Sequence, residues 1–235
     1  MSRDGRGALL VALGAMVAQL VWSGDFSSFV QLHMRWPLGA AAIALLALGL
    51  NDLVIARLGI VADAARRAAP VVGGLMMLPV AVLIAVAPTT LGSAAARRAG
   101  PPPPTATDEA FAPLPDDGRP IEMRVFEFMR RARSDQRFEL EGRHVVVEAF
   151  VVNDDRYPDG VLLSRFLVSC CAADALPVQI AVPTTLTFDD DTWVRATIEW
   201  DPVASAGEQR WLVVATLVEY TVLTAAPAAP YESPY

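Results

Sequence analysis

The chain has 235 residues, of which 54% are hydrophobic and only 19% are charged. Its charge is divided unevenly: residues 1–100 hold eight arginines and four acids, a net of +4, whereas residues 101–235 hold eleven and twenty-two, a net of −11. An acidic half of this size repels phosphate backbones, which excludes nucleic acid as an expected partner. Because the apolar excess lies before residue 100, we expect a membrane region followed by a soluble domain.

Residues 7–24 form the first apolar run. At about 1.5 Å of rise per residue, a helix of this length nearly crosses a hydrocarbon core about 30 Å thick. Trp22 lies near its end, where an interfacial indole is favoured. The alternative is a cleaved signal peptide, since Arg3 and Arg6 precede a short apolar core. The stretch after Trp22 lacks a clear small-x-small cleavage site, which favours a retained membrane helix.

Two further apolar runs predict a second and a third membrane span. The second, residues 37–56, includes Asn51 and Asp52, which we expect near the interface because an acid at mid-membrane is costly. The third, residues 70–91, contains Pro79, which predicts a kink. The sequence therefore predicts a transmembrane region of three helices over residues 1–99.

The arginines predict how these spans are oriented. Five lie before the first span or between the second and the third, and three lie on the opposite side. By the positive-inside rule the N-terminus is then cytoplasmic. With three spans, the C-terminal domain is extracytoplasmic, and the chain is a multi-pass protein of the cell membrane.

Residues 100–120 read as a linker, because four consecutive prolines open an extended, semi-rigid segment. The soluble domain is expected over residues 121–235. It begins with a short amphipathic helix over residues 121–133, whose C-terminal arginines complement the helix dipole.

Alternating apolar and polar residues predict strands in the remainder of the soluble domain. Five strands and one helix in roughly a hundred residues are typical of a small β-barrel of OB type. A fragment of a β-sandwich is the alternative fold. The five predicted strands cover residues 144–152, 161–169, 177–182, 192–200 and 210–221.

The only cysteines, Cys170 and Cys171, are adjacent in a small-residue turn between two predicted strands, and Asp174 follows. In one interpretation both thiols are small packing groups. In a second, the thiols and the carboxylate converge on a thiophilic metal such as zinc, or on a transported solute, which requires a helical turn. In a third, the pair forms a strained vicinal disulfide, because adjacent Cα atoms are closer than in ordinary bridges.

Other candidate sites are weaker than the cysteine turn. The two histidines, His33 and His144, belong to no cluster with ligand spacing, and Asp189–Asp191 reads as a solvated turn. The sequence contains no Walker loop, no Gly-x-Ser-x-Gly and no His-Glu-x-x-His. We therefore expect a protein that is not an enzyme.

Three stretches of the chain resemble the YcgQ-like family, the small subunits of a two-component permease. One resembles the family's entry into its second span and another its exit from the third, whereas the cysteine turn is close to the family's hallmark. The closing Pro230-Tyr231 also fits. The three stretches are Phe29–Leu38, Ala87–Arg97 and Arg165–Val178, the last containing Ser169-Cys170-Cys171-Ala172-Ala173-Asp174-Ala175.

The resemblance implies an accessory subunit that works beside a larger polytopic permease and is linked to metal, especially zinc, homeostasis. Some members carry a histidine-rich loop between the second and third spans, but residues 57–69 contain no histidine. The alternative function is a stand-alone envelope protein that binds or senses a ligand through its OB-like domain. A thiol oxidoreductase is a third hypothesis, although adjacent cysteines lack the Cys-x-x-Cys spacing of reactive pairs.

Overall fold

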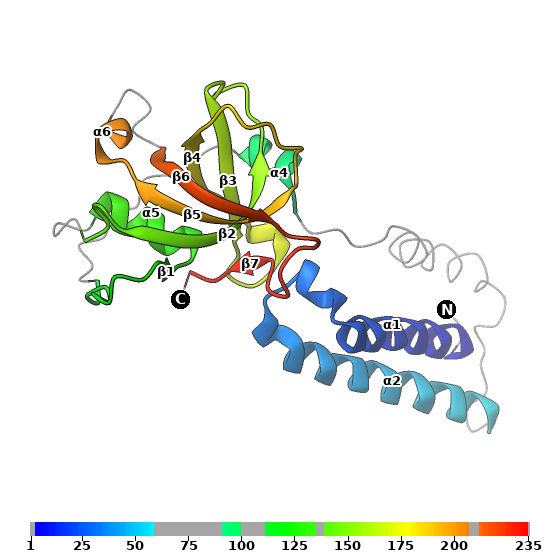
Figure 1. The fold of residues 1–235 in the computed structure, drawn as a ribbon. Coiled ribbons are helices and arrows are strands. Elements are labelled where there is room, and N and C mark those ends of the chain that lie inside the picture. Colours follow the sequence, from blue (N-terminus) through cyan, green and yellow to red (C-terminus); the bar gives the residue numbers. More distant parts are fainter. Residues whose placement is uncertain (1–2, 59–90, 100–110, 135–138, 207–211, 235) are drawn as a thin grey trace. The chain divides into compact units, whose positions relative to one another are not determined.

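The computed structural model describes residues 3–58, 91–99, 111–134, 139–206 and 212–234. The chain divides into two compact units, Met1–Thr89 and Thr90–Tyr235. The first unit is helical and the second is built on a β-sheet (Figure 1). The third predicted span, residues 70–91, lies outside the described residues except for its last position.

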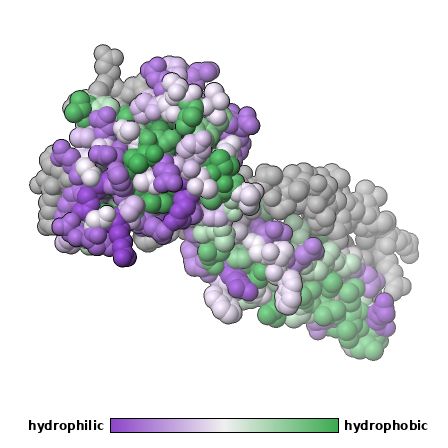
Figure 2. Space-filling view, in the orientation of Figure 1, coloured by the Kyte–Doolittle hydropathy of each residue, from purple (hydrophilic) through white to green (hydrophobic). Residues whose placement is uncertain are grey.

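The N-terminal unit is a pair of helices, α1 (Arg3–Ser23) and α2 (Arg35–Arg57). Gly24 ends α1 in the left-handed region at φ 86°, and the short 3₁₀ turns η1 (Asp25–Ser28) and η2 (Leu32–Met34) lead into α2. By length and composition, two helices in the described residues suit a membrane span, Asp4–Ser23 and Leu32–Arg57. Much of the helix surface visible in Figure 2 is apolar. The first two predicted spans are thus helices long and apolar enough to cross a membrane.

Glycines let the two helices pack closely. A Cβ atom at Gly7 would lie 2.8 Å from Leu53 Cγ, and one at Gly49 would lie 2.8 Å from the backbone nitrogen of Val11. Any larger residue at either position would push the helices apart. At the same end of the pair, the Arg6 guanidinium donates to both carboxylate oxygens of Asp52, at 2.6 and 2.8 Å. The buried acid at this end of α2 is therefore neutralised by α1.

The C-terminal unit contains a five-stranded barrel, as the alternating pattern predicted. The strands pair in the closed order β2-β3-β4-β6-β5 and back to β2, and only β4 and β6 run parallel. Closure of the sheet on itself excludes the β-sandwich alternative. The strands are β2 (His144–Val152), β3 (Gly160–Leu167), β4 (Leu176–Pro183), β5 (Trp193–Trp200) and β6 (Val213–Val222), with the short helix α6 (Pro202–Ser205) between the last two.

Helix α5 (Val125–Ser134) packs on the barrel core through Val125, Phe128 and Met129. The predicted helix began at residue 121, which is too early. Ile121 and Glu122 instead form β1, a two-residue strand that runs parallel to β2. The backbone amide of Met123 donates to the Val146 carbonyl, so this stretch pairs with β2 instead of joining α5.

A second apolar cluster lies on the other face of the barrel wall. Phe150 of β2 and Phe166 of β3 stack there with ring centroids 5.8 Å apart. Ala96 of helix α4 (Ser93–Ala99) and Tyr231 of strand β7 (Tyr231–Glu232) are buried in the same cluster. The barrel thus has two hydrophobic layers, of which the outer one is covered by segments from both ends of the unit.

Acidic residues hold α4 on the barrel. Asp191 accepts hydrogen bonds from the backbone amide (2.5 Å) and the hydroxyl (3.1 Å) of Ser93. Asp190 pairs with Arg97 at 2.8 Å. The sequence prediction assigned residues 93–99 to the membrane region, whereas the structure places them on the β-domain. Asp190 and Asp191, two of the three aspartates of the 189–191 turn, therefore dock a helix.

The carboxylate of Glu232 joins the C-terminal strand to α5. Its two oxygens accept hydrogen bonds from the backbone amides of Val125 (2.8 Å) and Phe126 (2.9 Å), at the first turn of α5. The buried guanidinium of Arg165 lies 3.8 Å from the same carboxylate and donates to the Ala229 carbonyl at 2.6 Å. Burial raises the pKa of Glu232, while the two amides and Arg165 oppose that rise.

We predict that Glu232→Leu destabilises the β-domain by about 3 kcal/mol, because it orphans two buried amides and removes the counter-charge of a buried arginine. Glu232→Gln should cost less, since its amide oxygen still accepts a hydrogen bond. Denaturant unfolding of the full chain in detergent, followed by tryptophan fluorescence, measures both. Glu141→Leu, at an exposed position, is the control and should change stability by less than about 0.5 kcal/mol. Equal unfolding midpoints for Glu232→Leu and the control would contradict this role.

Candidate functional site

The candidate site is the turn that connects β3 to β4. The backbone amide of Val168 donates to the Glu232 carbonyl at 2.9 Å, which fixes the start of the turn. Cys170 and Cys171 follow, and residues Ala172–Asp174 form the 3₁₀ turn η3. This is the helical geometry that a shared site for both thiols and Asp174 requires. Small side chains let the chain reverse here before Leu176 opens β4.

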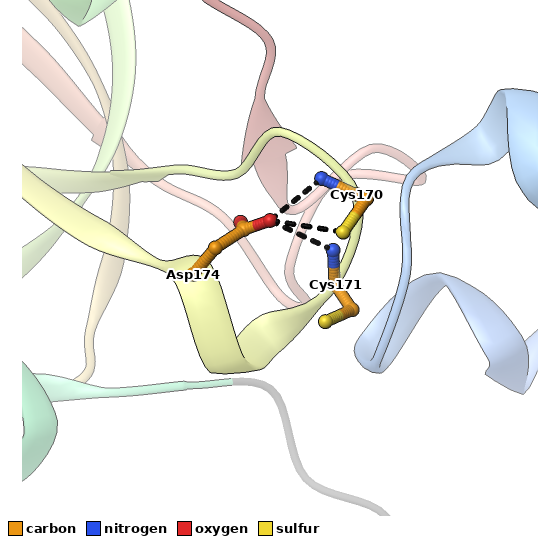
Figure 3. Close-up of side chains that lie close together, drawn as sticks. All are labelled: Cys170, Cys171 and Asp174. Carbon is orange, nitrogen blue, oxygen red and sulfur yellow. Dashed lines mark hydrogen bonds between the residues drawn. The ribbon is translucent and has the colours of Figure 1, made fainter.

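The carboxylate of Asp174 organises the turn (Figure 3). One oxygen accepts from the backbone amide of Ser169 at 2.9 Å. The other accepts from the amides of Cys170 (2.9 Å) and Cys171 (3.4 Å) and from the Cys170 thiol (3.1 Å). Three consecutive backbone amides thus converge on one acidic side chain, as in an anion-binding nest. Asp174 is first of all the residue that shapes this turn.

These contacts set the protonation of the site. Hydrogen bonding from the Cys170 thiol and from the backbone amides holds the pKa of Asp174 below its usual value. The Cys170 thiol donates to the same carboxylate. This hydrogen bond, and after it the interaction with the Cys171 thiol, raises the pKa of Cys170 to about 11. At neutral pH the site therefore pairs a carboxylate with a neutral thiol. A protonated thiol is a poor nucleophile, which argues against covalent or disulfide-exchange chemistry at Cys170.

The donor atoms suit a thiophilic cation. One ligand atom each from Cys170, Cys171 and Asp174 lies within 4.8 Å of the others. Two sulfurs and one oxygen from three residues form the donor set of an open tetrahedral zinc site, in which a fourth position is left for an exchangeable ligand. A bound cation would take the place of the Cys170 thiol proton, so that binding would release protons.

The structure bears on the three interpretations of the cysteines. Both thiols are free in this structure. Cys170 is exposed and Cys171 is partly exposed, so neither is enclosed as a packing group would be. The convergence of the three donor atoms makes this turn a possible metal-binding site.

The other sequence candidates lie away from such clusters. His33 belongs to η2, and His144 opens β2 with its imidazole 3.7 Å from Glu199. The amide groups that bind Asp174 were not predicted from the sequence. A signal was present, because an acid at the third position of a helical turn typically accepts hydrogen bonds from the amides that precede it. Arg165 and Glu232, which hold the end of β3 that leads into the turn, were not predicted either.

The chain thus combines two helices long and apolar enough to span a membrane with a small β-barrel that carries the cysteine turn. Residues 125–229 match the family model described as the DUF1980 C-terminal domain. This is the domain family of the YcgQ-like proteins, and the match includes the cysteine turn. No curated protein and no solved structure matches the chain.

We predict that Cys170 reacts with iodoacetamide at pH 8 at least about tenfold more slowly than an unperturbed thiol, because its raised pKa leaves little thiolate. Asp174→Asn should restore the rate of alkylation, because the side-chain amide is uncharged while its oxygen can still accept hydrogen bonds from the backbone amides. Mass spectrometry of a Cys171→Ala background isolates Cys170. Asp189→Asn, in an exposed turn, is the matched control and should leave the rate unchanged. Slow alkylation that persists in Asp174→Asn would show that the carboxylate does not control this thiol.

Proposed function

We propose that this protein is a membrane-anchored, non-enzymatic accessory subunit of a larger polytopic permease. In this proposal the β-domain binds a thiophilic metal ion, with zinc the leading candidate, at Cys170, Cys171 and Asp174. The observation that carries the proposal is the turn itself, in which two free thiols and a carboxylate converge on the surface of the domain. The domain-family match supports the same function through the resemblance to permease subunits.

The barrel supports a binding function for the domain. A five-stranded barrel closed in the order β2-β3-β4-β6-β5, with one parallel pair, is the arrangement expected of an OB-type fold, whose surfaces commonly bind ligands. Here the outer face of β2 and β3 is covered by the chain's own α4 and β7. Ligand binding is thereby shifted to the loops, of which the turn between β3 and β4 carries the soft donors.

The helices support the membrane location. α1 and α2 have spanning length and composition, and the Arg6–Asp52 pair neutralises the buried acid between them. We propose a third span over residues 70–91, a cytoplasmic N-terminus and an extracytoplasmic β-domain, as the arginine distribution predicts. In that topology the dithiol turn meets metal ions before or after they cross the membrane.

A second candidate function is a stand-alone envelope protein that binds or senses a ligand. It is favoured by the closure of the Arg6–Asp52 pair within the α1–α2 hairpin, because the hairpin then needs no second protein to neutralise its buried acid. The two functions differ in one observable, which is the presence of a stoichiometric polytopic partner.

We predict that the full-length chain, tagged at its C-terminus and extracted in a mild detergent, co-purifies with a polytopic membrane protein in a fixed ratio. Gly49→Leu disrupts the close approach of α1 and α2. It should therefore weaken the association if the α1–α2 hairpin contacts the permease, and leave it unchanged if the β-domain makes that contact. Gly39→Leu changes a glycine of α2 whose added Cβ would meet nothing within 4 Å, and it is the matched control. Purification of the chain alone from its native membrane, with the β-domain folded, would refute the subunit function and leave the stand-alone function.

A further inference from the structure

Strand β6 has one incomplete edge. It pairs with β5 over most of its length, from Val222 opposite Val194 to Ala215 opposite Trp200. It pairs with β4 at only two positions, Val213 and Val214. Among the described strands none occupies the second edge of residues 215–222. The backbone groups that point away from β5 along this stretch are therefore available to another strand.

The apolar side of the same stretch is only partly covered, by Phe188, whose ring lies edge-on to Tyr220 with centroids 5.1 Å apart. Side chains that lie opposite each other on an antiparallel ladder share a face, and Ala196 and Val194 of β5 are buried in the core. Their partners on β6 are not: Tyr220 is 39% exposed and Val222 is 52% exposed. Val218 is the extra residue of a β-bulge, because Glu219 lies opposite Thr197 and Leu217 lies opposite Ile198, and it is 48% exposed as well. The inner face of β6 thus continues past the barrel as an apolar strip of Val218, Tyr220 and Val222.

We propose that the edge of β6 over residues 215–222 is a docking site for an extended segment of a partner protein, which adds to the sheet as a further strand. An open edge supplies main-chain hydrogen bonds, and an apolar strip at alternate positions supplies pockets for alternate side chains. Natural proteins usually cover or charge such an edge, because it otherwise pairs with unintended strands. Residues 215–222 of β6 contain one charged side chain, Glu219, which lies on the face opposite the apolar strip.

Charge identifies the occupant as a cationic strand. Residues 101–235 carry a net charge of −11, and Glu219 lies between the strip residues Val218 and Tyr220. A second copy of the chain is disfavoured, because antiparallel pairing centred on Glu219 would place two glutamates directly opposite each other. The fitting partner segment alternates apolar residues, which face the strip, with arginine or lysine, which faces Glu219. This inference rests on the proposed subunit function, in which the partner is a permease.

The test uses the full-length chain in detergent and a capped nine-residue peptide of alternating valine and arginine. We expect the peptide to slow amide hydrogen exchange over residues 216–222. A peptide of the same composition with its valines and arginines in two blocks should not do so, and neither should an alternating valine–glutamate peptide. Tyr220→Lys should weaken the binding of the alternating cationic peptide about tenfold. Val203→Lys adds the same charge at a side chain that is 83% exposed and should leave that binding unchanged.

Equal protection by the alternating and the blocked peptide would overturn the proposal, because non-specific attraction to an acidic domain would then explain binding. Protection outside β6, or none at millimolar peptide, would overturn it too. Concentration-dependent protection of β6 without peptide would identify a second copy as the occupant. These outcomes are separate from the subunit test: if a permease co-purifies equally with wild type and Tyr220→Lys, assembly is real but does not use this edge.

Discussion

The buried carboxylate of Glu232 is the interaction on which the order of the β-domain depends. It closes the first turn of α5, which packs on the barrel core, and it lies beside the buried Arg165 of β3. The carbonyl of the same residue accepts the amide of Val168, immediately before the cysteine turn. A charge enclosed in this way is costly unless every partner is present, so that the C-terminal strand, α5 and β3 are held as one unit. These contacts of Glu232 therefore fix the position of the cysteine turn at the end of β3.

The turn repeats the same physical device at the surface. Asp174 replaces water with three backbone amides and one thiol, and the turn is therefore shaped before any ligand arrives. Preorganisation lowers the entropic cost of binding. The same hydrogen bonding keeps Cys170 protonated, with a pKa of about 11, so a cation that binds its sulfur must displace a proton. Metal binding at this site should therefore strengthen as pH rises toward that pKa and weaken as pH falls.

Local patterns predicted much of this structure, and non-local contacts explain what they missed. Burial alternates residue by residue in β5, whereas β3 and β4 are buried at six consecutive positions. The apolar and alternating patterns together predicted all five barrel strands within three residues at either end. The seven residues of α4 show no such period, and their contacts with Asp190 and Asp191 and the burial of Ala96 on the barrel assign them to the β-domain. The two-residue pairing of β4 with β6, which leaves the open edge, depends on the curvature of the closed sheet. In the site, the sequence indicated the three donor residues, but the amides around Asp174 required the backbone path.

X-ray absorption at the zinc edge, on the full-length chain loaded with one equivalent of zinc, tests the central claim most directly. A zinc site at the cysteine turn predicts a shell with two sulfurs at about 2.3 Å and lighter ligands at about 2.0 Å. It predicts the loss of one sulfur in each of Cys170→Ala and Cys171→Ala, and of none in Asp189→Asn. A shell of only oxygen and nitrogen ligands, unchanged in both cysteine variants, would contradict a metal site at this turn.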